Sequence, residues 1–173
     1  MNLRDIPLIG MLSAVLLTVQ VALLFLPNIE LISLLIIIYT LIFKKKTIYI
    51  ITTFVLVQGL LFGFSLWWVN YLYVWFILSI ITRLFKRETS SISWALISGF
   101  YGLLFGALCS IPYFFIGLSS GTVENGFHAA FAYWINGIPF DLVHGISNFF
   151  IALFLFKPIY KLLDYLYDKF KTT

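Results

Sequence analysis

The stretch W-I-N-G-I-P-F-D-L-V-H-G-I-S-N, residues 134–148, decides how the rest of the chain is interpreted. It opens the last long apolar segment, and at about 100° per residue Asp141, His144 and Asn148 fall on one face of a helix. An ionisable side chain at membrane depth costs roughly 2.5–3.5 kcal/mol on insertion scales, so it normally faces a cavity or a partner. We therefore expect this face to line a ligand pocket open to the outside. The alternative is that these polar groups only hold neighbouring helices together.

The composition sets the class of protein. The chain has 173 residues, of which 62% are hydrophobic, 20% aromatic and only 10% charged, with a mean hydropathy of +1.04. A water-soluble domain of this size cannot bury so much apolar surface. The sequence predicts an all-α membrane protein in which residues 1–173 form one integral membrane domain.

Six apolar segments alternate with short polar or basic connections. Because about 20 helical residues cross the hydrocarbon of a bilayer, these segments predict a bundle of six transmembrane helices. The predicted spans cover about residues 6–26, 30–43, 47–67, 69–84, 94–118 and 138–156, followed by an amphipathic helix over 160–170. We expect Pro112 to kink the fifth span, residues 117–126 to form a polar loop, and Lys157-Pro158 to end the sixth span.

The basic residues predict the orientation. With six spans, all 11 Lys and Arg residues fall on the same side of the membrane as both termini. The positive-inside rule then places both termini of this multi-pass protein in the cytoplasm. We expect the membrane to be a bacterial cell membrane. Basic residues at helix ends are a topology signal, so nucleic acid is not an expected partner.

Polar and aromatic side chains gather near the outer ends of the predicted spans. Glu30 is expected to cap the second helix, because a carboxylate favours a first helical turn. The alternative for Glu30, and an equal one for Asn28, is a place at the mouth of the pocket. The aromatic residues fit an interfacial belt, and they also fit a surface on which a flat ligand stacks. The candidate ligand-binding residues are Asn28, Trp68, Asn70, Tyr71, Tyr113, Glu124, His128, Trp134, Asn136, Asp141, His144 and Asn148.

Motifs for catalysis are missing from the sequence. It has no G-x-S-x-G elbow, no H-E-x-x-H and no glycine-rich phosphate loop. The spacing of His128, Asp141 and His144 matches no standard zinc pattern. Ser147 and His144 lie on adjacent turns of one helix, a geometry that does not direct the hydroxyl of a nucleophile toward the nitrogen of its base. We expect no enzyme activity, no metal and no cofactor.

Three stretches carry a resemblance to a known family. They are L-P-N-I-E-L (residues 26–31), G-L-L-F-G-A-L-C (residues 102–109) and the 134–148 stretch, which is followed later by Lys157-Pro158. Together with the chain length, the six predicted spans and the cytoplasmic basic residues, they resemble the substrate-binding S component of an energy-coupling factor (ECF) vitamin transporter. The resemblance implies that the protein captures a micronutrient from outside and releases it inside by toppling in the membrane.

The resemblance also implies partners. S components work with a membrane coupling subunit and two cytosolic ATPases, and small residues at a spacing of four on their first helix dock on the coupling subunit. The matching positions are Gly10, Ala14 and Thr18, with Gly where the family often has Ala. Close helix approach through such a stripe is also compatible with packing inside the same subunit.

The identity of the ligand does not follow from the sequence, because one fold can bind many compounds. Aromatic rings beside carboxylates and amides suit a flat, nitrogen-bearing heterocycle, and a larger corrinoid is also compatible. A different class remains open, namely a non-transport membrane scaffold such as the MreD-like cell-shape factors, which have a similar size and number of spans. Ligand affinity and co-purification with ATPases separate the two.

Overall fold

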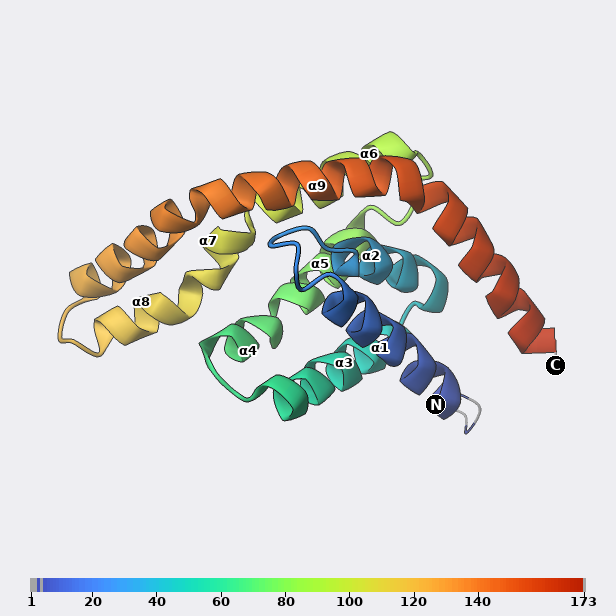
Figure 1. Ribbon diagram of the computed structural model, residues 1–173, viewed down its shortest axis with the longest axis horizontal. Helices are drawn as coiled ribbons and strands as arrows, with labels where there is room; N and C mark the ends of the chain where they lie inside the picture. Colours follow the sequence, from blue (N-terminus) through green and yellow to red (C-terminus); the bar gives the residue numbers. More distant parts are fainter. Residues whose placement is uncertain (1–2, 4, 173) are drawn as a thin grey trace.

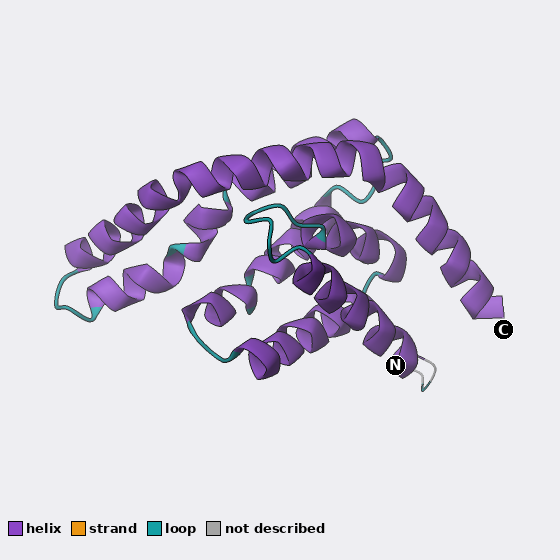
Figure 2. Cartoon of the chain, in the orientation of Figure 1, coloured by secondary structure: helices purple, strands orange, loops and turns teal. Residues whose placement is uncertain are grey.

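The computed structural model describes residues 3 and 5–172, and this part of the chain is helical with no strands (Figure 2). This confirms the all-α prediction. The helices are α1 (Asp5–Ala22), α2 (Ile32–Phe43), α3 (Lys46–Phe62), α4 (Leu66–Tyr71), α5 (Val74–Leu84), α6 (Ser91–Leu103), α7 (Phe105–Cys109), α8 (Ile111–Leu118) and α9 (Val123–Thr172).

The core is built around α2. Its residues are all buried except Leu41, which is partly buried. A helix that is apolar on every side is typical of a central element, since no face is suited to water. It packs against α5, α9, α3 and α1, so most of the chain surrounds it (Figure 1).

The longest element is α9, which runs along one side of the molecule and packs on α6, α8, α2 and α7 (Figure 1). It corrects the predicted sixth span and tail. The helix begins at Val123 instead of near Ile138, and it continues through Pro139 and Pro158 to Thr172. A proline inside a helix costs about 3 kcal/mol, and the long packed face of α9 offsets that cost. The bend in its last third is the remaining effect of proline on the helix (Figure 1).

The predicted fifth span is interrupted. It divides into α6, α7 and α8, with a bend of 42° at the break after Leu103. A second break at Ser110 puts Pro112 in the first turn of α8, where its missing N–H costs little. The kink expected at Pro112 is therefore a break just before it, and the larger bend at Leu104 was not predicted.

Other boundaries also differ from the predictions. Helix α1 ends at Ala22 and α3 at Phe62, each several residues before the predicted end. Gly63 has a φ of 86°, a left-handed conformation that ends α3 and that glycine adopts without strain. The fourth predicted span divides into α4 and α5, and the 117–126 loop narrows to residues 119–122.

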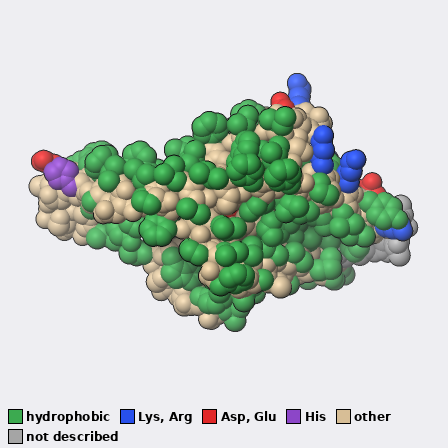
Figure 3. All heavy atoms as spheres, turned by 45° about the horizontal axis from the view of Figure 1, so that its top comes forward, with side chains coloured by type: hydrophobic (Ala, Val, Ile, Leu, Met, Phe, Trp, Pro, Cys, Tyr) green, Lys and Arg blue, Asp and Glu red, His purple; other side chains and the backbone are tan. Residues whose placement is uncertain are grey.

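The molecule has helices suited to a membrane. By length and composition α1 and α9 can cross a bilayer, and α6 with α7–α8 gives a third crossing if the bent pair counts as one span. The apolar helices α2 and α3, of 12 and 17 residues, are shorter. Apolar side chains cover most of the face shown in Figure 3, with the charged groups toward its ends. A membrane location is compatible with this surface, and the arrangement of six spans stays a prediction.

Helices α6 and α9 approach very closely through glycines. A Cβ added to Gly102 would lie 2.8 Å from the Cα of Gly145, and its neighbours there are backbone atoms. A Cβ added to Gly145 would overlap the side chain of Leu103. These glycines let α6 rest directly against the segment of α9 that carries His144.

Candidate ligand-binding site

A cavity of about 220 Å³ lies beneath the loop that joins α1 to α2. Its other walls come from α1, α4, α5, α7 and α9, so residues far apart in the sequence meet there. It is smaller than the roughly 300–1,000 Å³ of pockets for drug-sized ligands, so it suits a small molecule. The polar and aromatic side chains in its wall belong to Gln20, Asn28, Glu30, Tyr71, Trp75, Phe105 and His144.

A carboxylate–imidazole pair forms one part of the wall. Nε2 of His144 lies 3.2 Å from Oε1 of Glu30, and the two side chains are only 5% and 17% exposed. A carboxylate only accepts hydrogen bonds, so the ring donates from a protonated Nε2. The second oxygen of Glu30 accepts a hydrogen bond of 2.8 Å from the backbone N–H of Ser33, in the first turn of α2. The expected capping role of Glu30 is confirmed, and the same residue also reaches the cavity.

Two asparagine–serine hydrogen bonds fix the loop and the start of α2 against α9. The carbonyl of Asn28 accepts a hydrogen bond of 3.1 Å from Ser147, and Asn28 has a φ of 61°, which asparagine tolerates better than most residues. Nδ2 of Asn148 donates to the hydroxyl of Ser33 over 3.3 Å. The face of α9 predicted to be functional therefore holds the loop and the start of α2 in place around the Glu30–His144 pair.

Aromatic rings form the opposite wall. Tyr71 packs edge-on against Trp75 and Phe105 edge-on against His144, with ring centroids 5.2 and 4.9 Å apart. Between them, the rings of Trp75 and Phe105 are tilted, with centroids 5.8 Å apart. Nε2 of Gln20 donates to the Tyr71 hydroxyl over 3.1 Å. Within the described part of the chain, Oε1 of Gln20 and Nε1 of Trp75 are buried without a hydrogen-bond partner. Two residues of the wall thus carry a buried polar atom that the protein leaves without a hydrogen bond.

Asp141 has a different role from His144. It is buried on the same face of α9, as predicted, but it is not part of the cavity wall. Its Oδ1 accepts a hydrogen bond of 2.9 Å from the backbone N–H of Gly106, in the first turn of α7. A Cβ on Gly106 would overlap this carboxylate. Asp141 therefore provides a hydrogen-bond acceptor for a backbone N–H group that the break between α6 and α7 leaves without a partner in the helix.

Five other candidates lie on an arm that α8 and the first half of α9 form beyond the body of the molecule (Figure 1). Glu124 and His128 are exposed and 3.9 Å apart, one turn from each other. The ring of Tyr113 stacks on Tyr133 with centroids 4.0 Å apart. The structure does not bring this group to the cavity, and its members are Tyr113, Glu124, His128, Trp134 and Asn136.

The two remaining aromatic-turn candidates make internal contacts. Nε1 of Trp68 donates to the carbonyl of Val55 over 2.9 Å, which ties α4 to α3. Asn70 is buried with its Oδ1 2.9 Å from the hydroxyl of Tyr73. Of the twelve candidates, the cavity wall includes Asn28, Tyr71 and His144.

Sequence reasoning missed Gln20, Trp75 and Phe105. For Glu30 it favoured helix capping over a place at the mouth of the pocket, and the structure gives Glu30 both positions. A signal for Gln20 and Glu30 was present, because both are strongly polar residues close to the first outer turn. Trp75 belongs to the aromatic cluster of residues 67–75 from which other members were chosen. For Phe105, a common residue in an apolar segment, the sequence has no such signal.

The predicted docking stripe faces away from the core. Gly10, Ala14 and Thr18 are exposed, while Leu12 and Leu16 on the opposite face of α1 are buried. A Cβ added at Gly10 would meet no atom within 4 Å. Internal packing therefore does not explain the small side chains of this stripe.

Comparisons of the chain with protein-family models, with curated proteins and with solved structures found no match. The class that the structure itself defines is an all-helical protein with apolar helices able to cross a membrane.

Proposed function

We propose that the protein is the substrate-binding subunit of an ECF-type uptake transporter, with both termini in the cytoplasm and six spans. The observation that carries this proposal is the cavity beneath the α1–α2 loop. It combines a buried Glu30–His144 pair with an aromatic wall, a combination that suits a small, flat, polar micronutrient. The sequence resemblance supplies the transporter class, and the coupling subunit and two ATPases are its proposed partners.

The arrangement of the elements suits capture at one end of the molecule. The cavity lies at the start of α2, whereas the basic turn of Lys44 and Lys45 lies at its end. Twelve helical residues separate these ends by about 18 Å. Under the positive-inside rule the cavity then faces outward.

Mass spectrometry of small molecules retained by the purified protein tests this function. We expect one compound to co-purify in a stoichiometric amount and to be lost on mild denaturation. We also expect two ATPases and a membrane subunit to co-purify from the native membrane. A purified protein that retains no compound and no ATPase would favour the membrane-scaffold alternative.

The docking stripe gives a separate prediction. Trp in place of Ala14 is expected to abolish co-purification of the coupling subunit, because a bulky ring prevents close approach of two helices. Ligand retention is expected to stay within about twofold of wild type, a change worth well under 1.4 kcal/mol. Val15→Trp is the matched control, since Val15 is exposed on α1 about 100° away from Ala14 and should assemble normally. Equal loss of assembly in both variants would contradict a specific role for the stripe.

A further inference from the structure

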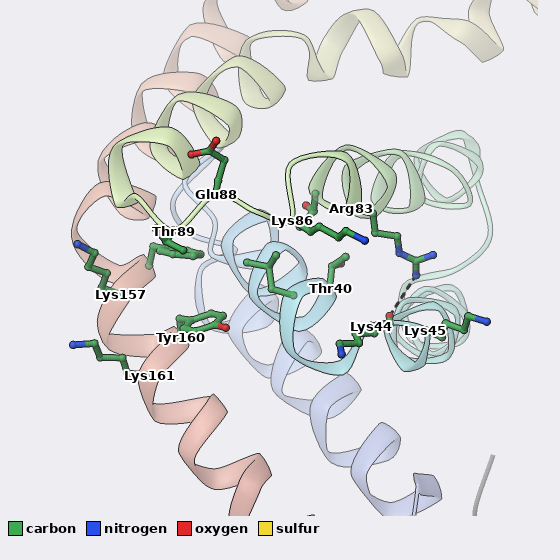
Figure 4. Close-up of a pocket in the computed structure, with 13 residues that line it drawn as sticks. Thr40, Lys44, Lys45, Arg83, Lys86, Glu88, Thr89, Lys157, Tyr160 and Lys161 are labelled. Atoms are coloured by element: carbon green, nitrogen blue, oxygen red, sulfur yellow. Dashed lines mark hydrogen bonds between the residues drawn. The ribbon is translucent and has the colours of Figure 1, made fainter.

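A second, larger cavity lies at the other end of α2 from the candidate ligand site. It has a volume of about 960 Å³ and opens where the end of α2, the α2–α3 turn, the end of α5, the α5–α6 loop and residues 156–161 of α9 meet. Figure 4 shows Lys44, Arg83 and Lys86 on one side of the cleft and Lys157 and Lys161 on the other, with the amino groups of Lys157 and Lys161 pointing outward from α9. Six of the lining residues are cations, and they come from three separate segments: Lys44, Lys45, Arg83, Lys86, Lys157 and Lys161.

The charge of this cleft is not balanced by the protein. Glu88 is the one carboxylate in its wall. Across residues 3 and 5–172, none of the six cations forms an ion pair. The neighbouring Lys46 is different, because its Nζ lies 2.6 Å from Asp5 and 3.1 Å from the hydroxyl of Tyr167. Lys46 is therefore paired with a carboxylate, whereas the six cations of the cleft share a single carboxylate that pairs with none of them.

The negative partial charges at helix C-termini neutralise only part of the positive charge in the cleft. The C-termini of α2 and α5 point toward the cleft, and Arg83 donates to the carbonyl of Lys44 over 3.3 Å. Each helix end is equivalent to roughly half a negative charge, so two ends neutralise about one of the six cations. The excess favours an anionic ligand that brings its own charge.

The cleft is not purely polar. Leu41, Phe156 and Tyr160 contribute to its lining beside buried Thr40 and Thr82. A site with cations at the rim and apolar and hydroxyl groups on the floor fits a molecule that joins a phosphate to an apolar body. Basic pockets between helices at a membrane surface bind lipid headgroups for this reason.

We propose that this cleft binds the phosphate headgroup of an anionic phospholipid at the membrane interface. The phosphate lies among the Lys and Arg side chains, and the glycerol and first acyl carbons lie against Phe156 and Leu41. The lipid then joins the α2–α3 turn, α5 and α9 at the end of the molecule opposite the candidate ligand cavity.

The test uses the full chain in nanodiscs of phosphatidylcholine to which phosphatidylglycerol is added, with native mass spectrometry as the readout. We expect saturable binding of phosphatidylglycerol. The double variant Lys86→Gln/Lys157→Gln removes one cation from each wall and is expected to weaken this binding at least tenfold, which corresponds to about 1.4 kcal/mol. Both side chains are exposed, so the melting temperature in phosphatidylcholine alone should not change.

The matched control is Lys169→Gln/Lys171→Gln, which removes the same charge from the end of α9, outside the cleft. It should keep wild-type affinity for phosphatidylglycerol, and millimolar inorganic phosphate should not displace the lipid. Equal weakening in both double variants would overturn the proposal, because it would show attraction by net charge alone. Displacement by inorganic phosphate would overturn it in favour of a free phosphate ligand. Neither result bears on the micronutrient cavity, which is tested separately.

Discussion

Gly102→Ala is expected to lower the free energy of unfolding by about 1–3 kcal/mol, the range for an overpacked interior. The new methyl group would lie 2.8 Å from Cα and 2.9 Å from N of Gly145, and 3.0 Å from the carbonyl carbon of His144. These are backbone atoms of α9, so no side-chain rotation relieves the contact and the two helices must separate. Reversible denaturation of the purified protein in detergent measures the change.

Gly137→Ala is the control for this prediction. Gly137 also lies in a helix, and a Cβ there would meet no atom within 4 Å. Alanine is favoured over glycine in a helix interior by roughly 0.5–1 kcal/mol, so this variant should be as stable as wild type or slightly more so. If Gly102→Ala has the same stability as Gly137→Ala, the close packing of α6 on α9 is wrong.

The same packing shows what the sequence could and could not predict. The sequence has glycines in the fifth predicted span and Gly145 in the sixth, but nothing in it pairs Gly102 with Gly145. The basic residues were expected at one end of the helices, and six of them do line one cleft. Charge and hydropathy patterns are local properties, and they predicted the helical class and the polar face of α9.

The contacts of the site depend on distant pairs of residues. His144 meets Glu30 across 114 positions, and Gln20 meets Tyr71 across 51. Neither partner can be chosen from sequence spacing alone. The helix breaks are equally non-local, because the bend at Leu104 is accommodated by Asp141, which accepts from the freed N–H of Gly106. The predicted helix boundaries at Pro139 and Pro158 were wrong, because the packing of α9 outweighs the local free-energy cost of a proline inside a helix.

His144→Ala is expected to weaken binding of the retained compound at least tenfold, which corresponds to about 1.4 kcal/mol. His144 lines the cavity and is 5% exposed, so a hydrogen bond from it to a ligand is shielded from water. The variant should also lose stability. Removing the imidazole leaves the Glu30 carboxylate without that partner, at a cost of about 1–3 kcal/mol. Loss of binding alone therefore does not distinguish a ligand contact from a folding defect.

The double variant Glu30→Gln/His144→Ala separates the two effects. A neutral glutamine side chain at position 30 still accepts from the Ser33 N–H, and it costs less to bury than an unpaired carboxylate. Stability should therefore recover in part relative to His144→Ala, as measured by denaturation in detergent. Affinity for the retained compound, measured by isothermal titration calorimetry, should not recover, because the imidazole is still missing.

Asp141→Asn completes the comparison, since it changes a buried carboxylate on the same face of α9 outside the cavity wall. The amide oxygen can still accept from Gly106, so affinity should stay within about threefold of wild type, a difference below 1 kcal/mol.

If affinity instead recovers together with stability in the double variant, His144 serves the fold and not the ligand. If Asp141→Asn weakens binding as much as His144→Ala, the compound contacts α9 outside this cavity. Tenfold weaker binding in both His144 variants, with partial recovery of stability in the double variant alone, would assign the Glu30–His144 pair to the ligand.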